Sequence, residues 1–304
     1  MEAQEKNIIG NLIEINIMEL WIIFAIGSAV FGGLFNFILK TAAHKKYNVS
    51  ELLVGTYLAA SIMGLVVFGH KFASVDKLWL IILYAALNAV TYFFVHRLRI
   101  KSLKFIDSTI YFPVYKTIGP IIILFVSFLV FRESLNTQEW VGVVLGIITS
   151  WLLVSKSEEE RQNNLKKGLS LMFVGTLLTT VGIGLNKFVN ISGLDKELFI
   201  VVTSIFLLII TAVKLKQENQ KKSVKLFTNK RVVYLGIING VIVLSTAYLM
   251  ILALEGNIAI VYTINSFSIL ITVLLSVFFF KEHFNIRKAL AVIASVLAGI
   301  FFIN

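Results

Sequence analysis

The sequence predicts an all-α integral membrane protein whose ten transmembrane helices form two inverted five-helix repeats. Of its 304 residues, 58% are hydrophobic and 15% are charged, and the mean hydropathy is +0.87. Apolar runs of about 18 to 25 residues recur along the whole chain, and each is long enough as a helix to cross a hydrocarbon core. The runs are continuously apolar and lack the in-and-out alternation of an outer-membrane barrel, so helices are the expected spanning structure.

Ten apolar runs supply the predicted spans. They are residues 18–39, 51–69, 78–95, 107–131, 138–155, 167–188, 197–214, 232–254, 257–280 and 286–303. The polar stretch SKSEEERQNNLKK near the middle divides them into five and five. We therefore expect a first repeat at 1–155, a linker at 156–166 and a second repeat at 167–304. The acidic N-terminus is unlike the basic start of a cleaved signal peptide, so the first span is expected to remain in the mature protein.

An internal similarity supports this division. The segment FRESLNTQEWVGVVLGIITSWLLV (131–154) aligns without a gap with FKEHFNIRKALAVIASVLAGIFFI (280–303), at an offset of 149 residues. This alignment and looser correspondences earlier in each half pair Phe131 with Phe280, Arg132 with Lys281, Glu133 with Glu282, Asn136 with Asn285, Gly32 with Gly182, Asn36 with Asn186 and Asn88 with Asn239. Because each half has an odd number of spans, the second half must enter the membrane from the opposite side, which makes the repeat inverted.

Small residues recur four positions apart in the last span of each half. The fifth span carries Gly142 and Gly146, and the tenth carries Ala291, Ser295 and Gly299. Such rows let helices approach closely in lipid. We expect them to serve helix packing, and they would also allow a homodimer through the fifth and tenth spans.

Both halves end with an aromatic–Glu pair, a polar turn and a last span rich in small residues, FRESLNTQEWVGVVLG and FKEHFNIRKALAVIAS. With Pro113 or Pro120 in the fourth span, this pattern resembles the EamA-type members of the drug/metabolite transporter superfamily. The second half departs from the pattern, because its ninth span has no proline and its tenth span has Ala291 and Ser295 in place of glycines. The resemblance implies a secondary carrier that exports, or sometimes imports, small metabolites through a central cavity between the repeats.

The orientation in the membrane stays open. Lys and Arg concentrate in the loops that follow odd-numbered spans, which by the positive-inside rule puts both termini outside. The resemblance implies two cytoplasmic termini instead. In either orientation we expect a multi-pass protein of the plasma or inner membrane, and we take the basic loops as topology signals, so no nucleic acid is expected as a partner.

The segment YFPVYKTIGPIIILF (111–125) contains both prolines of the chain and one lysine. Lys116 is the one ionisable residue well inside a predicted span, where a charge is costly and usually faces a wet cavity. We expect it to bind an anionic group of a substrate; alternatively, the span begins later and the amine reaches lipid headgroups. Pro113, Gly119 and Pro120 would loosen the helix as a hinge, or else produce a kink tolerated for packing.

Further polar residues recur in the spans around this segment. The 149-residue offset carries Lys116 onto Asn265, so a polar group occurs at the same depth in both halves. The predicted substrate-binding set comprises these two residues and Tyr92, Tyr111, Tyr115, Tyr248, Tyr262, Asn36, Asn88, Asn186 and Asn239. Pockets for metabolites combine apolar walls with a few such groups, although each alone is also typical of a helix-packing hydrogen bond.

Several function classes are excluded or disfavoured. The chain has no cysteine, no nucleotide-binding GxxxxGK[ST] loop and no metal-ligand spacing among its four histidines. No Asp or Glu lies deep in a span, which disfavours cation/proton antiport. We expect no enzyme, metal or cofactor, but a secondary transporter, with export favoured, of a small polar metabolite that is anionic or zwitterionic, such as an amino acid. The alternatives are a flippase-like carrier of a lipid-linked group and a non-transporting membrane scaffold.

Overall fold

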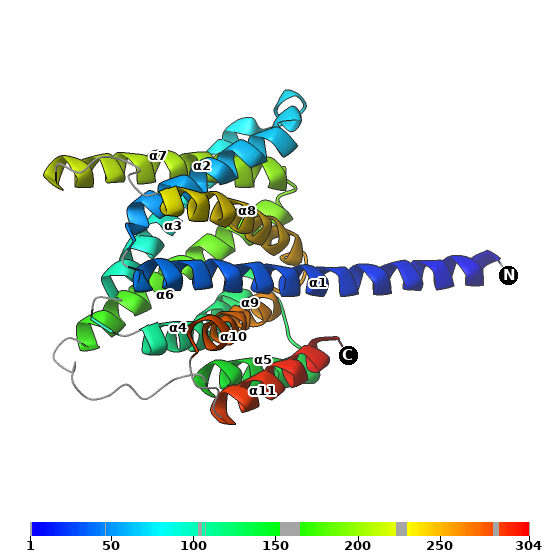
Figure 1. The fold of residues 1–304 in the computed structure, drawn as a ribbon. Helices are drawn as coiled ribbons and strands as arrows, with labels where there is room; N and C mark the ends of the chain where they lie inside the picture. The colour runs from blue at the N-terminus through cyan, green and yellow to red at the C-terminus, as the bar shows by residue number, and fades with distance from the viewer. Residues whose placement is uncertain are drawn as a thin grey trace.

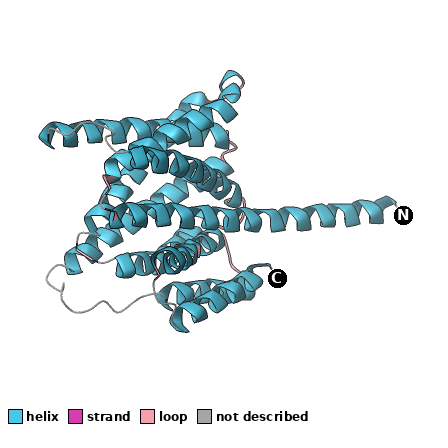
Figure 2. Ribbon diagram, in the orientation of Figure 1, coloured by secondary structure: helices cyan, strands magenta, loops and turns pink. Residues whose placement is uncertain are grey.

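The computed structural model describes residues 2–45, 47–102, 105–106, 108–152, 165–222, 230–281 and 286–303, and the regular elements in these ranges are all helices (Figure 2). The α-helices are α1 (Glu2–His44), α2 (Val49–Phe68), α3 (Leu78–Ser102), α4 (Ser108–Val126), α5 (Thr137–Leu152), α6 (Leu165–Ile191), α7 (Lys196–Lys222), α8 (Lys230–Ala253), α9 (Ile258–Ser266), α10 (Ser268–Phe280) and α11 (Ile286–Ile303). A 3-10 turn at Gly69–Ala73 follows α2, and a π-helical turn at Ser127–Phe131 follows α4.

Eight stretches of the described residues are long and apolar enough to cross a membrane. They are Leu20–Ala42, Val49–Ala73, Leu78–Ser102, Val114–Phe131, Lys166–Ile191, Lys196–Glu218, Lys230–Ala253 and Ile258–Phe280. Large apolar side chains lie on their outer faces, with Val66 80% exposed and Leu129 and Phe278 each 78% exposed. An apolar exterior of this kind fits lipid as the solvent, so the chain is a multi-pass membrane protein.

The helices form one bundle, with α5 and α11 packed side by side at its edge (Figure 1). Helix α1 packs against α8, α9 and α10, α2 against α7 and α8, and α3 against α6 and α7. Helix α4 contacts α5, α6 and α9, while α11 packs mainly on α5. Helices α1 to α4 and α6 to α10 surround the centre of the bundle, where most of the polar residues of the predicted site lie.

Helix ends carry recognisable capping chemistry. The Asn48 side chain accepts hydrogen bonds from the backbone N–H groups of Ser50 and Glu51 at the start of α2, and Asn257 caps α9 in the same way. At their C-terminal ends, the π-helical turn stops at Arg132 and α10 stops at Lys281. Both residues are in the left-handed conformation, with φ of 55° and 54°. These two residues are the pair that the 149-residue alignment matches.

Some predicted boundaries are wrong. Helix α3 continues to Ser102 and not to residue 95, and α7 continues to Lys222 and not to residue 214, because more polar turns extend each helix beyond its apolar run. Residues 156–164 of the predicted linker lie outside the described residues, and residues 165 and 166 belong to α6. Glu282 and Asn285, which the alignment pairs with residues of the first half, also lie outside them.

The helix interruption occurs in the ninth predicted span and not at the prolines. Helix α4 runs through Pro113 and Pro120 without a break, whereas the span Ile258–Phe280 is divided at Phe267 into α9 and α10. There the Phe267 N–H donates to the Ile264 carbonyl three residues earlier, at 3.0 Å, which tightens the chain for one turn. The hinge role of Pro113, Gly119 and Pro120 therefore stays a prediction.

The small-residue rows pack inside the chain to different extents. A Cβ atom at Gly142 would lie 2.5 Å from the Phe302 ring of α11, and one at Gly146 would clash with Thr263 of α9. Ala291 is fully buried, whereas Ser295 donates to the Val292 carbonyl of its own helix. A Cβ atom at Gly299 would meet no described atom within 4 Å, so the close packing predicted at Gly299 does not occur within this part of the chain. The homodimer stays a prediction, but Gly142 and Gly146 already serve intramolecular contacts.

Candidate functional site

A cavity of about 220 Å³ lies at the centre of the bundle, between helices α1 to α4 and α6 to α10. Eight of the predicted substrate-binding residues line it: Asn36, Asn88, Tyr92, Tyr115, Lys116, Asn186, Tyr262 and Asn265. All the lining residues are described, and none of them is an Asp or a Glu. The volume is below the roughly 300–1,000 Å³ typical of drug-sized ligands, so the cavity suits a small molecule.

Lys116 is buried at the centre of this cavity, with 7% of its surface exposed. Its ammonium Nζ donates to the backbone carbonyl of Asn265 at 3.2 Å and to the Asn265 side-chain Oδ1 at 3.3 Å. It also lies 5.9 Å from the ring centroids of both Tyr115 and Tyr262. These neutral contacts hold the ammonium group without neutralising its charge.

The contact between α4 and α9 depends on a glycine. A Cβ atom at Gly119 would lie 2.7 Å from the Tyr262 ring and hydroxyl, so only glycine leaves room for this tyrosine. Beyond the contact, Asn265 Nδ2 donates to the Ser28 hydroxyl at 3.2 Å, and that hydroxyl donates to the Thr246 carbonyl at 3.2 Å. A continuous chain of polar contacts therefore joins α4, α9, α1 and α8 across the cavity.

A second polar wall is formed by α3, α4 and α6. The Asn88 amide donates to Asn186 Oδ1 at 2.6 Å and to the Gly182 carbonyl at 3.2 Å. The Tyr115 hydroxyl donates to the Thr179 hydroxyl at 2.9 Å. The asparagines are thus oriented by one another, and both line the cavity.

Three of the predicted substrate-binding residues do not line the cavity. Tyr111 is 1% exposed and stacks behind Tyr115, with ring centroids 5.8 Å apart and planes inclined by 10°. Asn239 is fully buried between α8 and α2, where its amide donates to the Thr56 hydroxyl at 2.9 Å. Tyr248 packs against the Phe68 ring at 5.5 Å. The contacts of Asn239 and Tyr248 are those of helix packing.

Three lining residues with titratable side chains are absent from the predicted set: Tyr57, His96 and Arg99. The Tyr57 hydroxyl and His96 Nε2 are hydrogen-bonded at 2.8 Å, and the Arg99 guanidinium carbon lies 5.4 Å from the centroid of the Tyr115 ring. Because the apolar run ends at residue 95, hydropathy predicts a loop at His96 and Arg99. The signal in the sequence is spacing, since positions 88, 92, 95, 96 and 99 fall on one face of a helix that continues beyond that run.

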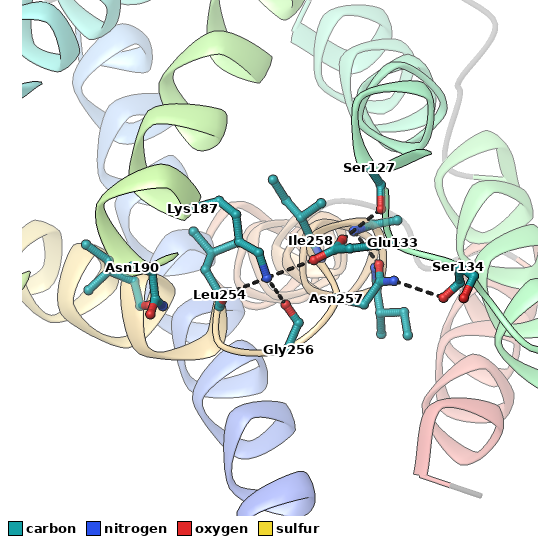
Figure 3. Close-up of polar contacts among 12 residues, drawn as sticks. Ser127, Glu133, Ser134, Lys187, Asn190, Leu254, Gly256, Asn257 and Ile258 are labelled. Carbon is teal, nitrogen blue, oxygen red and sulfur yellow. Dashed lines mark hydrogen bonds and ion pairs between the residues drawn. The ribbon is translucent and has the colours of Figure 1, made fainter. Parts of the chain in front are cut away.

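A second polar cluster joins the loop after α4 to α6 and to the loop between α8 and α9 (Figure 3). Lys187 on α6 is 5% exposed, and its Nζ forms an ion pair with Glu133 Oε1 at 2.8 Å. The same Nζ donates to the carbonyls of Leu254 at 2.9 Å and Gly256 at 2.7 Å. Hydropathy alone places Lys187 at the end of the sixth span, where a lysine is typical of a loop.

The other carboxylate oxygen of Glu133 is also paired. Oε2 accepts from the Ser127 hydroxyl at 2.8 Å and from the Ile258 backbone N–H at 3.0 Å, so the negative charge lies at the N-terminus of α9 (Figure 3). The adjacent Asn257 amide approaches the Ser134 carbonyl at 3.4 Å. The aromatic–Glu motif of the first half therefore fastens the first five helices to the start of α9.

The polar groups of the cavity are therefore amides, hydroxyls, the imidazole of His96 and two cations. In the described part of the chain, no group of three or more His, Asp or Glu residues is arranged to hold a metal ion. The cavity thus offers hydrogen-bonding groups together with the cationic side chains of Lys116 and Arg99.

Comparisons with known proteins address the family and the fold. No curated protein is significantly similar in sequence to this chain. Twenty-nine chains among solved structures are significantly similar in structure. One of them, a crystal structure of a protein, superposes with a TM-score of 0.71 at 13% sequence identity over 92% of this chain and 97% of its own, which shows a shared fold.

The family comparison confirms the resemblance seen in the sequence. Residues 19–155, somewhat less than half of the chain, match the model of the EamA-like transporter family. Members of this family are transporters and not enzymes. The apolar helices and the family match support a membrane transporter, and residues 19–155 are similar to the EamA-like transporter family of the drug/metabolite transporter superfamily.

Proposed function

We propose that the chain is a secondary carrier of the cell membrane that exports a small polar metabolite with at least one negative group, by alternating access between two inverted five-helix repeats. Eight stretches of the described residues are long and apolar enough to cross a membrane. Helices α5 and α11 would supply the remaining two, and α9 with α10 would act as one interrupted span. Interrupted spans near the bilayer midplane are typical binding elements of secondary transporters.

The helix contacts support the inverted repeat. If α1 corresponds to α6, α2 to α7 and α3 to α8, the contact of α3 with α6 should have a counterpart between α8 and α1, and the contact of α2 with α8 a counterpart between α7 and α3. Both counterparts are present. The matched left-handed ends at Arg132 and Lys281 agree with the same correspondence, and the family match ends at residue 155, the predicted end of the first repeat.

The observation that carries the function is the buried Lys116 in a central cavity whose lining contains no carboxylate. A buried charge costs roughly 2.5–3.5 kcal/mol on insertion scales and usually marks a substrate pathway. An anionic substrate would neutralise the ammonium group, while the asparagine amides and tyrosine hydroxyls would orient the rest of the molecule. A membrane scaffold would not require such a cavity.

Transport in reconstituted vesicles tests this proposal. Lys116→Ala should lower the uptake of accepted substrates by at least about tenfold, because a hydrogen bond to a charged group contributes about 1.5–3 kcal/mol. Lys196→Ala is the control, since Lys196 is a basic residue that pairs with Glu255 outside the cavity. Unchanged flux of every accepted substrate in a folded Lys116→Ala protein would remove Lys116 from the mechanism.

A further inference from the structure

The cavity contains a second cation, which deepens the proposed function and rests on it. Arg99 belongs to the face of α3 that also carries Asn88, Tyr92 and His96. Its guanidinium group lies beside the ring of Tyr115, with its central carbon 5.4 Å from the centroid. Lys116 Nζ lies 5.9 Å from the same centroid. The two positive groups are therefore no more than about 11 Å apart.

Neither cation has an ionic partner among the described residues. Both hydrogen bonds of Lys116 go to Asn265, which is neutral. The Nε atom of Arg99 is buried and has no hydrogen-bond partner in the described chain. The two like charges also repel each other, and the repulsion is stronger in a buried site than in water. The cavity has a donor and a net positive charge that its own residues leave unsatisfied.

The chemistry of a matching ligand follows from this arrangement. We infer that the cavity selects a compact dianion, with one anionic group at Arg99 and a second anionic oxygen at Lys116. A dicarboxylate or a phosphate monoester has this shared feature. A zwitterionic amino acid would bring its ammonium group into a cavity that has two cations and no carboxylate, so it is the poorer match.

Neutral groups complete the site. Asn36 is 8% exposed and lines the cavity on α1, as Asn88 does on α3 and Asn186 on α6. Amides both donate and accept, so they can bind hydroxyl or carbonyl groups along the body of the ligand. The cations would thus set the charge of the substrate, and the amides would discriminate among molecules of that charge.

Binding to the purified protein in lipid nanodiscs tests the inference. The probes are succinate and glycerol phosphate as dianions, acetate and lactate as monoanions, and alanine as a zwitterion. We expect at least about tenfold tighter binding of one or both dianions than of either monoanion or alanine. Tighter binding of succinate would indicate a dicarboxylate as the ligand, and tighter binding of glycerol phosphate would indicate a phosphate monoester. Either preference supports the inference.

Variants separate the two cations. Arg99→Gln should weaken dianion binding by about 10- to 100-fold and change monoanion binding less than about threefold, so that the preference disappears. Arg99→Lys should restore part of the preference because it keeps the charge. Arg97→Gln is the matched control, since Arg97 lies on the same helix beside the ring of Phe93 and does not line the cavity. Thermal unfolding of each variant verifies that it is folded.

The outcomes also distinguish this inference from the proposed function. Equal affinity of the wild-type protein for monoanions and dianions, or a preference that survives in Arg99→Gln, would overturn the inference while leaving a Lys116-dependent carrier intact. If the protein shows no preference for dianions and its flux is also unchanged in Lys116→Ala, the inference and the proposed function are both overturned. If Arg99→Gln does not fold, the inference is tested by the preference of the wild-type protein for dianions and by the retention of part of that preference in Arg99→Lys.

Discussion

Removing the charge of Glu133 should destabilise the protein strongly, because Glu133 is the partner of a buried lysine. The Glu133→Gln side chain would keep the shape of the native one but remove its negative charge, so the Lys187 ammonium would have only neutral acceptors such as the carbonyls of Leu254 and Gly256 (Figure 3). Breaking a buried ion pair by removing one partner costs about 3–5 kcal/mol. The Glu133 side chain is 18% exposed, so partial screening lowers our expectation to about 2–4 kcal/mol.

The measurement is the free energy of unfolding in mixed micelles, and an exposed pair in the same protein is the control. Lys196 and Glu255 also form an ion pair, but the Glu255 side chain is 49% exposed. Glu255→Gln should therefore change the free energy of unfolding by about 1 kcal/mol or less. Combining Glu133→Gln with Lys187→Met removes the unpaired charge and should recover at least about 1 kcal/mol relative to additivity. Equal effects of Glu133→Gln and Glu255→Gln would refute the reasoning.

Two further predictions concern packing. Gly119→Ala should displace Tyr262, because the new Cβ atom would lie 2.7 Å from its ring, and we expect a loss of about 1–3 kcal/mol in unfolding free energy and slower transport. Gly299→Ala, with no described atom within 4 Å of the new Cβ atom, is the control and should change neither quantity. An unaffected Gly119→Ala protein would contradict a close approach of Tyr262 to α4. Asn239→Ala should lower the free energy of unfolding by about 1–3 kcal/mol, because the hydrogen bond from the Asn239 amide to the Thr56 hydroxyl is lost. The transport rate per folded protein should stay constant, and a selective loss of transport would instead make Asn239 a substrate ligand.

The parts of the fold that follow from composition could be predicted from the sequence. Apolar runs indicate the positions of the helices, and the 149-residue offset pairs Lys116 with Asn265, which are in direct contact. Helix ends are less predictable. Arg99 is a polar residue beyond an apolar run, and only the continuation of one helical face brings it into the cavity.

Interactions between distant segments could not be predicted. Nothing in the local sequence of Lys187 or Glu133 indicates that they meet, because their pairing depends on how the first five helices dock on α6 and α9. The division of the ninth span at Phe267 also has no local signal, since no proline or glycine marks it. Asn239 is predicted to bind substrate but contacts a neighbouring helix instead. A polar residue in a span can do either, and the sequence alone does not distinguish the two roles.

The contact between Lys116 and Asn265 has a geometric consequence. Under the proposed repeat, these residues occupy equivalent positions, and two equivalent positions related by a twofold axis can touch only where that axis passes between them. The contact would therefore mark the pseudosymmetry axis of that repeat. Identical lysines there would bring two ammonium groups together with no carboxylate in the cavity to separate them. Two halves of identical sequence could not both hold a charged lysine at this point, so the central charge requires that the halves differ.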